Sequence, residues 1–385
     1  MGEYDSELSK IVAELNRAAP SQKMAAGAAR GTQSSASLDK VLQQAAARNA
    51  SDILLVAGAP VMLRVTGNLT VVPGPPLEPE DVRDFVLPLL EAHQAEELYR
   101  NKTVDFGFYR EGLGRFRVNI HHQRATLAAC IRLLPAKIPT LESLHLPLHL
   151  AKLADKRQGM VLLTGPTGCG KSSALAALID IVNTRRAAHV VTIEDPVEYQ
   201  HTNRSAVIEQ IEVGRDTPDF AVTLRSIMRQ SPDVILVGEM RDAETVATAL
   251  TAAETGHLVL STLHTNDTVQ CVSRILDIFP TVNQPQIRQQ LSLALLAVIA
   301  QQLVPGVDGV TRWPATEIMI ATDAVRALIR KGDDHQLRSQ ISVGKADGMI
   351  TMEQSLVELV RAGRIDRETA FAHCYRTDDL QRYLS

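Results

Sequence analysis

Length, composition and charge place the chain among ordinary globular proteins with more than one domain. It has 385 residues, of which 45% are hydrophobic and 22% charged, and its formal net charge is −4. A chain of this length usually forms two domains, and its slightly acidic balance does not favour nucleic acid, which selects a basic face. The four cysteines form no C-x-x-C pair, so the sequence predicts neither a zinc site nor a disulfide framework.

The N-terminal residues predict a tethered helix rather than a membrane segment. Residues 4–18 have apolar side chains on one helical face, and the low-complexity stretch up to Ala36 predicts a flexible linker, so 1–36 is expected to be a helix and a linker. No apolar stretch in the chain reaches the ~18 residues of a membrane-spanning helix. The longest candidate, 291–300, is predicted to be a buried helix. We therefore expect no transmembrane segment.

A small α+β domain is predicted for residues 37–138. A capped amphipathic helix begins at Ser37, and a second helix is expected around 79–99. The strand-like segments are 52–56, 61–65, 114–119 and 128–132. Helices and strands mixed in about 100 residues are typical of an α+β domain. Prolines then predict a connector at 139–150.

From residue 151, short apolar strands alternate with helices. The predicted strands are 160–164, 189–194, 233–238 and 257–262. The predicted helices are 171–183, 217–230, 242–255 and 284–303. Nearly continuous apolar runs predict parallel strands that are covered on both faces. The expected fold class is therefore an α/β nucleotide-binding core over 151–321, followed by a helical segment over 322–385.

The most specific motif follows the strand at 160–164 directly. Its residues are Gly165, Pro166, Thr167, Gly168, Cys169, Gly170, Lys171 and Ser172, and the helix-forming stretch beyond them begins with Ser173. The G-x-x-x-x-G-K-S spacing between a strand and a helix predicts a phosphate-binding loop. Its glycines let backbone N–H groups surround a polyphosphate at the positive end of the helix dipole. Lys171 can reach the β- and γ-phosphates and Ser172 can ligate Mg²⁺, so ATP and Mg²⁺ are the expected ligands.

Acidic residues follow two further strands. Glu194, Asp195 and Glu198 lie on the loop after the strand at 189–194, where a carboxylate can hold Mg²⁺ or take a proton from water. Glu239 ends the apolar strand at 233–238, which is Walker B geometry, and can hold Mg²⁺ directly or through water. Asp242 opens the next helix and is predicted to cap it. These carboxylates should lie beside the phosphate loop, because ligands of such sheets bind at the carboxyl ends of the strands.

The strand at 257–262 has a histidine at each end. His264 follows the strand on the same edge as the phosphate loop, where it can sense the γ-phosphate or position water. His257 begins the strand and should lie at the opposite edge unless the chain curves back, so geometry leaves its role open. Arg117 and Arg132 lie in the small domain. One interpretation is that both are ordinary solvated surface residues. The other is that, in a ring of NTPases, they neutralise the charge of a phosphate that another domain holds.

Together these blocks closely resemble the secretion-superfamily ATPases, and within them the type IV pilus retraction (twitching motility) ATPases. The matching blocks are 165–172, 192–198, 232–242 and 251–266, which correspond to that family's Walker A motif, Asp box, atypical Walker B motif and His box. Outside them, 114–119, 131–135, 324–330 and 348–352 also match. The resemblance covers roughly residues 38–370, and motifs of this length rarely arise by chance.

The resemblance implies an architecture and site roles. It implies a PAS-like N-terminal domain, a RecA-like ATPase core and a homohexameric ring with nucleotide between the two domains. In that family's terms, Glu198 is the general base, Glu239 is the Walker B acid, and His257 and His264 form the His-box pair.

The resemblance also implies a setting in the cell. Arg117 and Arg132 would reach the nucleotide from the N-terminal domain. The partner would be the pilus platform protein of the inner membrane, at its cytoplasmic face.

Several alternatives remain open. An accessory retraction paralogue shares the same motifs. An assembly ATPase of pili or type II secretion typically carries a four-cysteine zinc insertion, which the scattered cysteines do not provide. A nucleic-acid translocase would need a basic surface or stacking aromatics, and only 4% of the residues are aromatic. A non-hydrolysing regulator would not need Glu198, Glu239 and His264.

Overall fold

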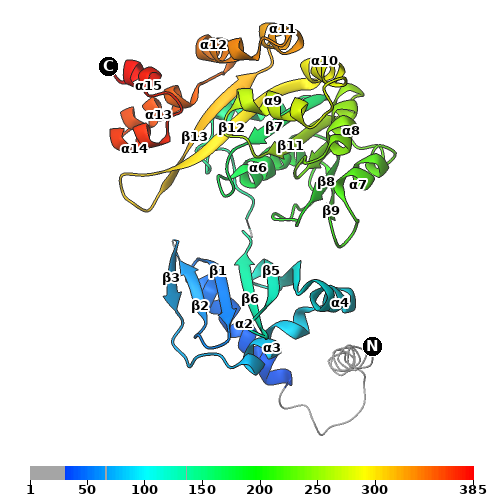
Figure 1. Ribbon diagram of the computed structural model, residues 1–385, viewed down its shortest axis with the longest axis vertical. Coiled ribbons are helices and arrows are strands. Elements are labelled where there is room, and N and C mark those ends of the chain that lie inside the picture. Colours follow the sequence, from blue (N-terminus) through cyan, green and yellow to red (C-terminus); the bar gives the residue numbers. More distant parts are fainter. Residues whose placement is uncertain (1–30, 66, 136) are drawn as a thin grey trace. The chain divides into compact units, whose positions relative to one another are not determined.

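The computed structural model describes residues 31–65, 67–135 and 137–385, with side chains from residue 38 onward. The chain divides into two compact units, Met1–Ala136 and Lys137–Ser385, each described by itself (Figure 1). The helix predicted at 4–18, and most of the linker predicted after it, lie outside the described residues. Among the described residues, none of the helices is both long and apolar enough to cross a membrane.

The first unit is an antiparallel sheet covered by helices (Figure 1). Its six strands are arranged in the order β3-β2-β1-β6-β5-β4. The strands are β1 (Ala50–Val56), β2 (Met62–Val65), β3 (Asn68–Val71), β4 (Thr103–Arg110), β5 (Gly114–Gln123) and β6 (Thr126–Leu133). The helices are α2 (Gly31–Ala47), α3 (Pro79–Val86), η1 (Leu87–Leu89) and α4 (Ala92–Asn101). Leu42 of α2, Val82 of α3 and Leu98 of α4 join the sheet in one hydrophobic core.

Two helix boundaries in this unit differ from the prediction. Helix α2 begins at Gly31, six residues before the predicted start at Ser37. The single helix predicted for 79–99 is instead α3, the short 3₁₀ turn η1 and α4. The break follows from Pro88 inside η1, because proline has no N–H to donate to the preceding turn of a helix.

The second unit is built on a mainly parallel sheet (Figure 1). Its seven strands are arranged in the order β13-β12-β7-β11-β10-β8-β9, and only β13 is antiparallel to its neighbour. The strands are β7 (Gly159–Thr164), β8 (His189–Glu194), β9 (Val207–Glu212), β10 (Val234–Val237), β11 (Leu258–Leu263), β12 (Leu295–Pro305) and β13 (Arg312–Ile320). The helices before β12 are η2 (Leu148–Leu150), α5 (Ala151–Ala154), α6 (Lys171–Arg185), α7 (Phe220–Ile227), α8 (Ala243–Glu254), α9 (Thr268–Asp277) and α10 (Gln284–Ala294).

Both faces of this sheet are buried, as the continuous apolar runs predict. Along β7, Met160 and Leu162 join a core with residues of α7 to α10. The alternate residues, Val161 and Leu163, join a second core with residues of α5 and α6. The phosphate loop therefore leaves the sheet from a strand whose six residues are all buried.

The helix predicted for 284–303 is wrong in its second half. Helix α10 ends at Ala294, and the chain continues directly as β12. The run from Leu291 to Ala300 is apolar except for Ser292, and such a run fits a buried strand as well as a buried helix. In the structure, the second half of this run pairs with β7 and has buried neighbours on both faces, so it forms a strand.

The chain after β13 is helical, with a buried charge cluster fixing it to the core. The remaining helices are α11 (Asp323–Lys331), η3 (Asp334–Gln336), α12 (Leu337–Val343), η4 (Gly344–Asp347), α13 (Met352–Arg361), α14 (Arg367–His373) and α15 (Thr377–Leu384). Glu353 is fully buried and bonds to Arg338 at 2.5 Å. Glu317 of β13 accepts hydrogen bonds from Thr268 of α9, and burial raises the pKa of its carboxyl group.

Candidate nucleotide site

The phosphate loop fits against β12 so closely that two of its positions must be glycine. At Gly165, with φ of +139°, an added Cβ would lie 2.1 Å from the carbonyl oxygen of Gln301. Gly170 begins α6 with φ of +94°, and its Cβ would lie 2.9 Å from Gln301 Nε2. A side chain at either position would combine an unfavourable backbone conformation with a clash. The first and last glycines of the motif are therefore required by the packing of the loop itself.

Lys171 is held over the loop at the start of α6. Its side chain is buried, and Nζ donates to the carbonyl oxygens of Gly165 at 2.7 Å and Pro166 at 3.1 Å. Burial lowers the pKa of Lys171, while the nearby carboxylates of Glu198 and Glu239 act in the opposite direction. The loop lysine and these two predicted acids are thus close enough to interact electrostatically.

Cys169 behaves as a buried structural residue of the loop. It is 3% exposed, and burial raises the pKa of its thiol. A raised thiol pKa reduces the fraction of reactive thiolate. The prediction that Cys169 is a small filler residue agrees with this environment.

The acidic loop after β8 is attached both to β9 and to α6. The backbone N–H of Val197 donates to Glu212 Oε2 at 3.1 Å, and Gln210 Nε2 donates to the carbonyl oxygen of Tyr199 at 2.8 Å. The Tyr199 hydroxyl bonds to Ser173 Oγ at 2.7 Å, directly after the phosphate motif. These contacts fix the loop that carries Glu198 beside the start of α6.

The three acids of this loop are in different environments. Glu194 Oε1 accepts hydrogen bonds from Thr192 at 2.7 Å and Gln210 at 3.1 Å, and burial raises the pKa of its carboxyl group. Asp195 is exposed, whereas Glu198 is half-buried and acts on Lys171. Among the three acids of this loop, Glu198 is therefore the one whose carboxylate acts on the pKa of Lys171 in the phosphate loop.

Glu239 lies between two basic side chains at the end of β10. Its carboxylate is 2.6 Å from a guanidinium nitrogen of Arg241 and 3.5 Å from Nε2 of His264, and its side chain is 14% exposed. The hydroxyl of Thr262 on β11 donates to the carbonyl oxygen of Gly238 at 2.6 Å, which fixes the preceding residue. The structure thus brings together Glu239 and His264, which the sequence predicts at the same edge.

A pair of threonines joins the phosphate strand to the His264 loop. Thr164 ends β7, and its hydroxyl donates to the carbonyl oxygen of Thr265 at 2.6 Å. The backbone N–H of Thr265 donates back to the same hydroxyl at 2.9 Å. These buried bonds join the end of β7, directly before the phosphate loop, to the residue next to His264.

His257 is not brought to the phosphate loop of its own chain. It precedes β11, and its carbonyl oxygen accepts from the N–H of Gly159 at the start of β7. Its ring Nδ1 is 2.9 Å from the carbonyl oxygen of Ala252 at the end of α8. It therefore lies at the amino-end edge of the sheet, as the strand geometry predicts.

Asp242 caps α8, with its carboxylate accepting from the N–H of Thr245 at 2.8 Å, so this cap prediction is confirmed.

The two predicted arginines are neighbours in the first unit. Arg117 on β5 is paired directly with Arg132 on β6, so both side chains lie on the same face of that sheet. Arg132 Nε donates to the buried carboxylate of Asp52 at 2.9 Å, and Arg117 lies 3.9 Å from Asp105. Their approach to a nucleotide stays a prediction.

Gln301 is a site residue that sequence reasoning missed. It lies on β12, is 4% exposed, and its Nε2 donates to the carbonyl oxygen of Cys169 at 2.7 Å. Its Oε1 has no hydrogen-bond partner among the described residues. The available signal was a pair of glutamines, Gln301 and Gln302, interrupting an apolar run. Successive side chains of a strand point to opposite faces of the sheet, so a strand directs Gln301 and Gln302 to different sides. The prediction of a helix for this run did not include that alternation.

The residues present fit a magnesium-bound nucleoside triphosphate. Three positions of the loop, Gly165, Gly168 and Gly170, carry no Cβ atom, and Lys171 supplies a cation beside the loop. Ser172 and Glu239 offer the oxygen ligands that Mg²⁺ prefers. No cluster of three or more metal-ligating side chains occurs among the described residues.

A parallel sheet, a phosphate loop at the carboxyl end of β7 and acids at the ends of β8 and β10 define a class of protein. This is the P-loop nucleoside triphosphatase core of the RecA type. The antiparallel first unit and the helical segment after β13 are additions to that core.

Comparison with known proteins identifies the family. Residues 117–363 match the model of the Type II/IV secretion system protein family. The chain is 42% identical over 333 residues to the type IV pilus retraction ATPase PilT of Pseudomonas aeruginosa, covering 86% of this chain and 96% of that protein. It is 40% identical over 343 residues to the type IV pilus ATPase PilU of the same organism, covering 89% and 90%.

A solved structure agrees with the sequence comparisons. A crystal structure of the pilus retraction motor PilT with bound ADP matches with a TM-score of 0.83 and 42% identity, covering 89% of this chain and 98% of that one. The chain therefore belongs to the Type II/IV secretion system protein family and, within it, to the group that contains the pilus ATPases PilT and PilU.

Proposed function

We propose that this chain hydrolyses ATP with Mg²⁺ to drive type IV pilus retraction, as a subunit of a homohexameric motor. One observation carries the proposal: Lys171, Glu198, Glu239 and His264 gather at one sheet edge in a chain that matches PilT over most of both lengths. PilT is named as a retraction ATPase. A phosphate-binding lysine, carboxylates and a histidine at one edge support a site for phosphoryl transfer to water.

We assign each residue of the site one role in hydrolysis. The loop N–H groups and Lys171 bind the phosphates, and Glu198 takes a proton from the attacking water. Ser172 and Glu239, the latter directly or through water, would hold Mg²⁺, which would supply positive charge to the phosphate oxygens. His264, already 3.5 Å from Glu239, is placed to orient water or to sense the γ-phosphate.

The other predicted residues, Arg117, Arg132 and His257, contribute to the nucleotide site in the assembled ring. Arg117 and Arg132 neutralise phosphate charge from the N-terminal domain, which couples the nucleotide state to a domain movement. His257 contributes to nucleotide contacts in the assembled ring, a role supported by its place in the His box and not by its position in one chain. The partner is the inner-membrane platform protein of the pilus, at the cytoplasmic face.

A genetic experiment tests this function. Deleting the gene from its host is expected to leave surface pili that do not retract, and the unchanged gene restores retraction. A gene encoding Lys171→Ala is expected not to restore it, although the protein accumulates normally. Normal retraction in the deletion strain, or with the Lys171→Ala protein as its sole copy, contradicts the proposal.

An accessory retraction ATPase is a second candidate. The chain is nearly as similar to PilU, at 40% identity, as to PilT, at 42%. An accessory subunit adds force to a motor that another ATPase already drives. If the deletion strain still retracts against low load and fails only against high load, the accessory function is supported.

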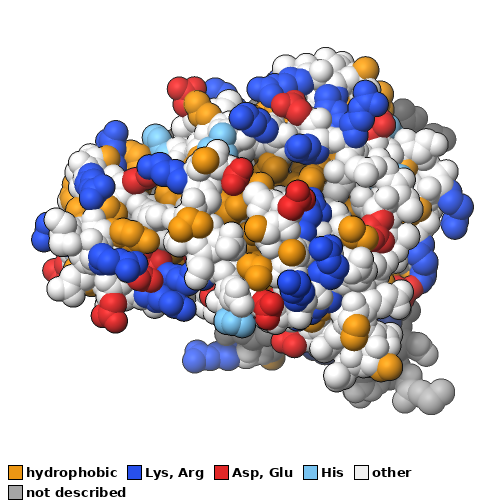
Figure 2. Space-filling model, turned by 90° about the horizontal axis from the view of Figure 1, so that it is seen from above, with side chains coloured by type: hydrophobic (Ala, Val, Ile, Leu, Met, Phe, Trp, Pro, Cys, Tyr) orange, Lys and Arg blue, Asp and Glu red, His pale blue; other side chains and the backbone are white. Residues whose placement is uncertain are grey.

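A nucleic-acid motor on the same core is disfavoured by the composition of the chain. Figure 2 shows one face of the molecule, on which Lys and Arg side chains are spread with Asp and Glu side chains among them. Translocases that grip a nucleic-acid strand need a basic groove with stacking aromatics. The net charge of −4 and the 4% aromatic content do not favour such a groove.

A further inference from the structure

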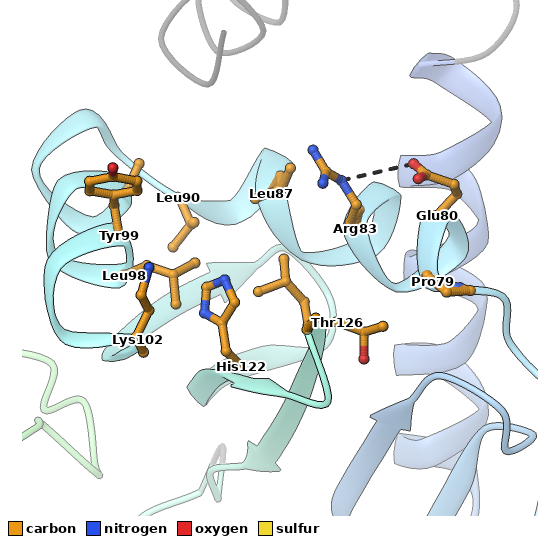
Figure 3. A pocket seen from close by; sticks show the side chains of 13 residues that line it. Pro79, Glu80, Arg83, Leu87, Leu90, Leu98, Tyr99, Lys102, His122 and Thr126 are labelled. Carbon is orange, nitrogen blue, oxygen red and sulfur yellow. Dashed lines mark ion pairs between the residues drawn. The ribbon is translucent and has the colours of Figure 1, made fainter. Parts of the chain in front are cut away.

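The first unit contains a pocket that plays no part in the nucleotide chemistry (Figure 3). It has a volume of about 550 Å³ and lies between α3, α4 and the hairpin that joins β5 to β6. Every residue that lines it belongs to the first unit, whereas the phosphate loop belongs to the second. Pockets of roughly 300–1,000 Å³ are the usual size for sites of small molecules.

The inner wall of the pocket is apolar. Leu90, Leu98 and Leu127 line it and are 7%, 5% and 8% exposed. These side chains also belong to the core between the helices and the sheet, so the wall is rigidly supported. Covering the apolar surface that still faces the pocket is favourable by about 25 cal/mol per Å². The wall therefore suits the aliphatic or aromatic part of a ligand.

The rim of the pocket is cationic. Arg83 comes from α3, Lys102 follows α4, and His122 comes from β5, so three separate elements each contribute a basic side chain to the lining of the pocket (Figure 3). The Lys102 ammonium is held 4.8 Å from the centre of the Tyr99 ring, which also lines the pocket. A group of basic side chains beside an apolar wall selects an anion that also has an apolar part.

An acidic side chain stands beside the basic ones in the lining of the pocket. Glu80 is the one acid among the described residues that line it, and its carboxylate lies 3.8 Å from Arg83. Its side chain is 83% exposed, so it points to solvent rather than into the apolar part (Figure 3). Ion pairs exposed to this degree contribute little, so an incoming anion competes with Glu80 at small cost.

We propose that this pocket binds a small amphipathic anion, namely an apolar chain or ring that carries one carboxylate or phosphate group. The apolar part lies against Leu90, Leu98 and Leu127, and the anionic group is held by Lys102 and Arg83. Because a ligand that binds only the folded state stabilises it, occupancy raises the thermal stability of the protein without involving the phosphate loop.

The test measures binding of ten-carbon probes to the full-length protein by calorimetry, below their micelle concentrations. Decanoate and decyl phosphate carry the two anionic groups, and decylamine and decanol supply the same chain with a positive or no charge. We expect at least one anion to bind and to raise the melting temperature, with decylamine and decanol at least about tenfold weaker. The stronger of the two anions identifies the head group.

Variants then locate the site. Lys102→Gln, and Lys102→Gln combined with Arg83→Gln, are expected to weaken binding of the anion by about tenfold or more. Arg100→Gln is the matched control, because Arg100 is exposed on the same helix and does not line the pocket. The proposal is overturned if neither anion binds, if decanol or decylamine binds as tightly, or if the double variant binds like Arg100→Gln.

Discussion

Replacing Gln301 with leucine removes a single buried hydrogen bond from beneath the phosphate loop. Its Nε2 donates to the carbonyl oxygen of Cys169 at 2.7 Å, and both residues are less than 5% exposed. Leucine has a similar size but cannot donate, so the carbonyl group loses this partner in a buried position. Leaving a buried group unsatisfied costs about 1–3 kcal/mol. The loop recovers that energy only by moving away from β12, which displaces its N–H groups from the phosphates.

The expected effect is a loss of nucleotide affinity. Because 1.4 kcal/mol corresponds to a factor of ten, the ADP dissociation constant should rise by roughly tenfold, with an upper bound near a hundredfold. Calorimetric titration with ADP measures this value, and phosphate release shows whether kcat/KM for ATP falls in parallel.

Gln302 offers a matched control on the same strand. Its Nε2 donates to the carbonyl oxygen of His373 at 2.8 Å, away from the loop. Gln302→Leu therefore loses a comparable bond and a comparable amount of thermal stability, but it should keep wild-type ADP affinity. If Gln301→Leu and Gln302→Leu bind ADP equally well, Gln301 does not position the loop and the reasoning fails.

Three further predictions address the loop and its surroundings. Lys171→Ala should reduce phosphate release by about a hundredfold or more with an unchanged circular dichroism spectrum, and near-normal release would show that the phosphates bind elsewhere. Gly165→Ala should lower the melting temperature more than Gly168→Ala. The added Cβ lies 2.1 Å from the carbonyl oxygen of Gln301 in the first variant and meets nothing within 4 Å in the second. Equal shifts of the melting temperature in the two variants would contradict this reasoning. Burial lowers the pKa of His201 to about 4, so the native state resists protonation and its stability should decline as pH falls from about 6.5 towards 4. Chemical denaturation across that range should show this decline in the wild type and a weaker one in His201→Phe.

Much of the core was predictable because its signals are local. The strand before Gly165, the glycine spacing and Lys171 at the helix start specify the loop in one continuous segment. The positions of Glu239 and His264 followed from a general rule, since residues after parallel strands meet at one edge of the sheet. Their 3.5 Å separation agrees with that rule.

The parts that were missed depend on distant contacts. A continuous apolar run does not reveal its period, so β12 was predicted as a helix, and Gln301 could not be placed 2.7 Å from a residue 132 positions earlier. The attachment of the Glu198 loop through Tyr199 and Ser173 likewise joins residues whose partnership no local pattern indicates. The pocket in the first unit arises from three elements and has no motif at all.

The most direct test of the central claim is a comparison of ATP binding and phosphate release in Glu198→Gln. If Glu198 takes the proton from water, the variant should bind ATP with wild-type affinity in the presence of Mg²⁺ and release phosphate about 10²- to 10⁴-fold more slowly. Wild-type turnover by this variant would contradict the account, because the acid assigned as the general base would then have no part in hydrolysis.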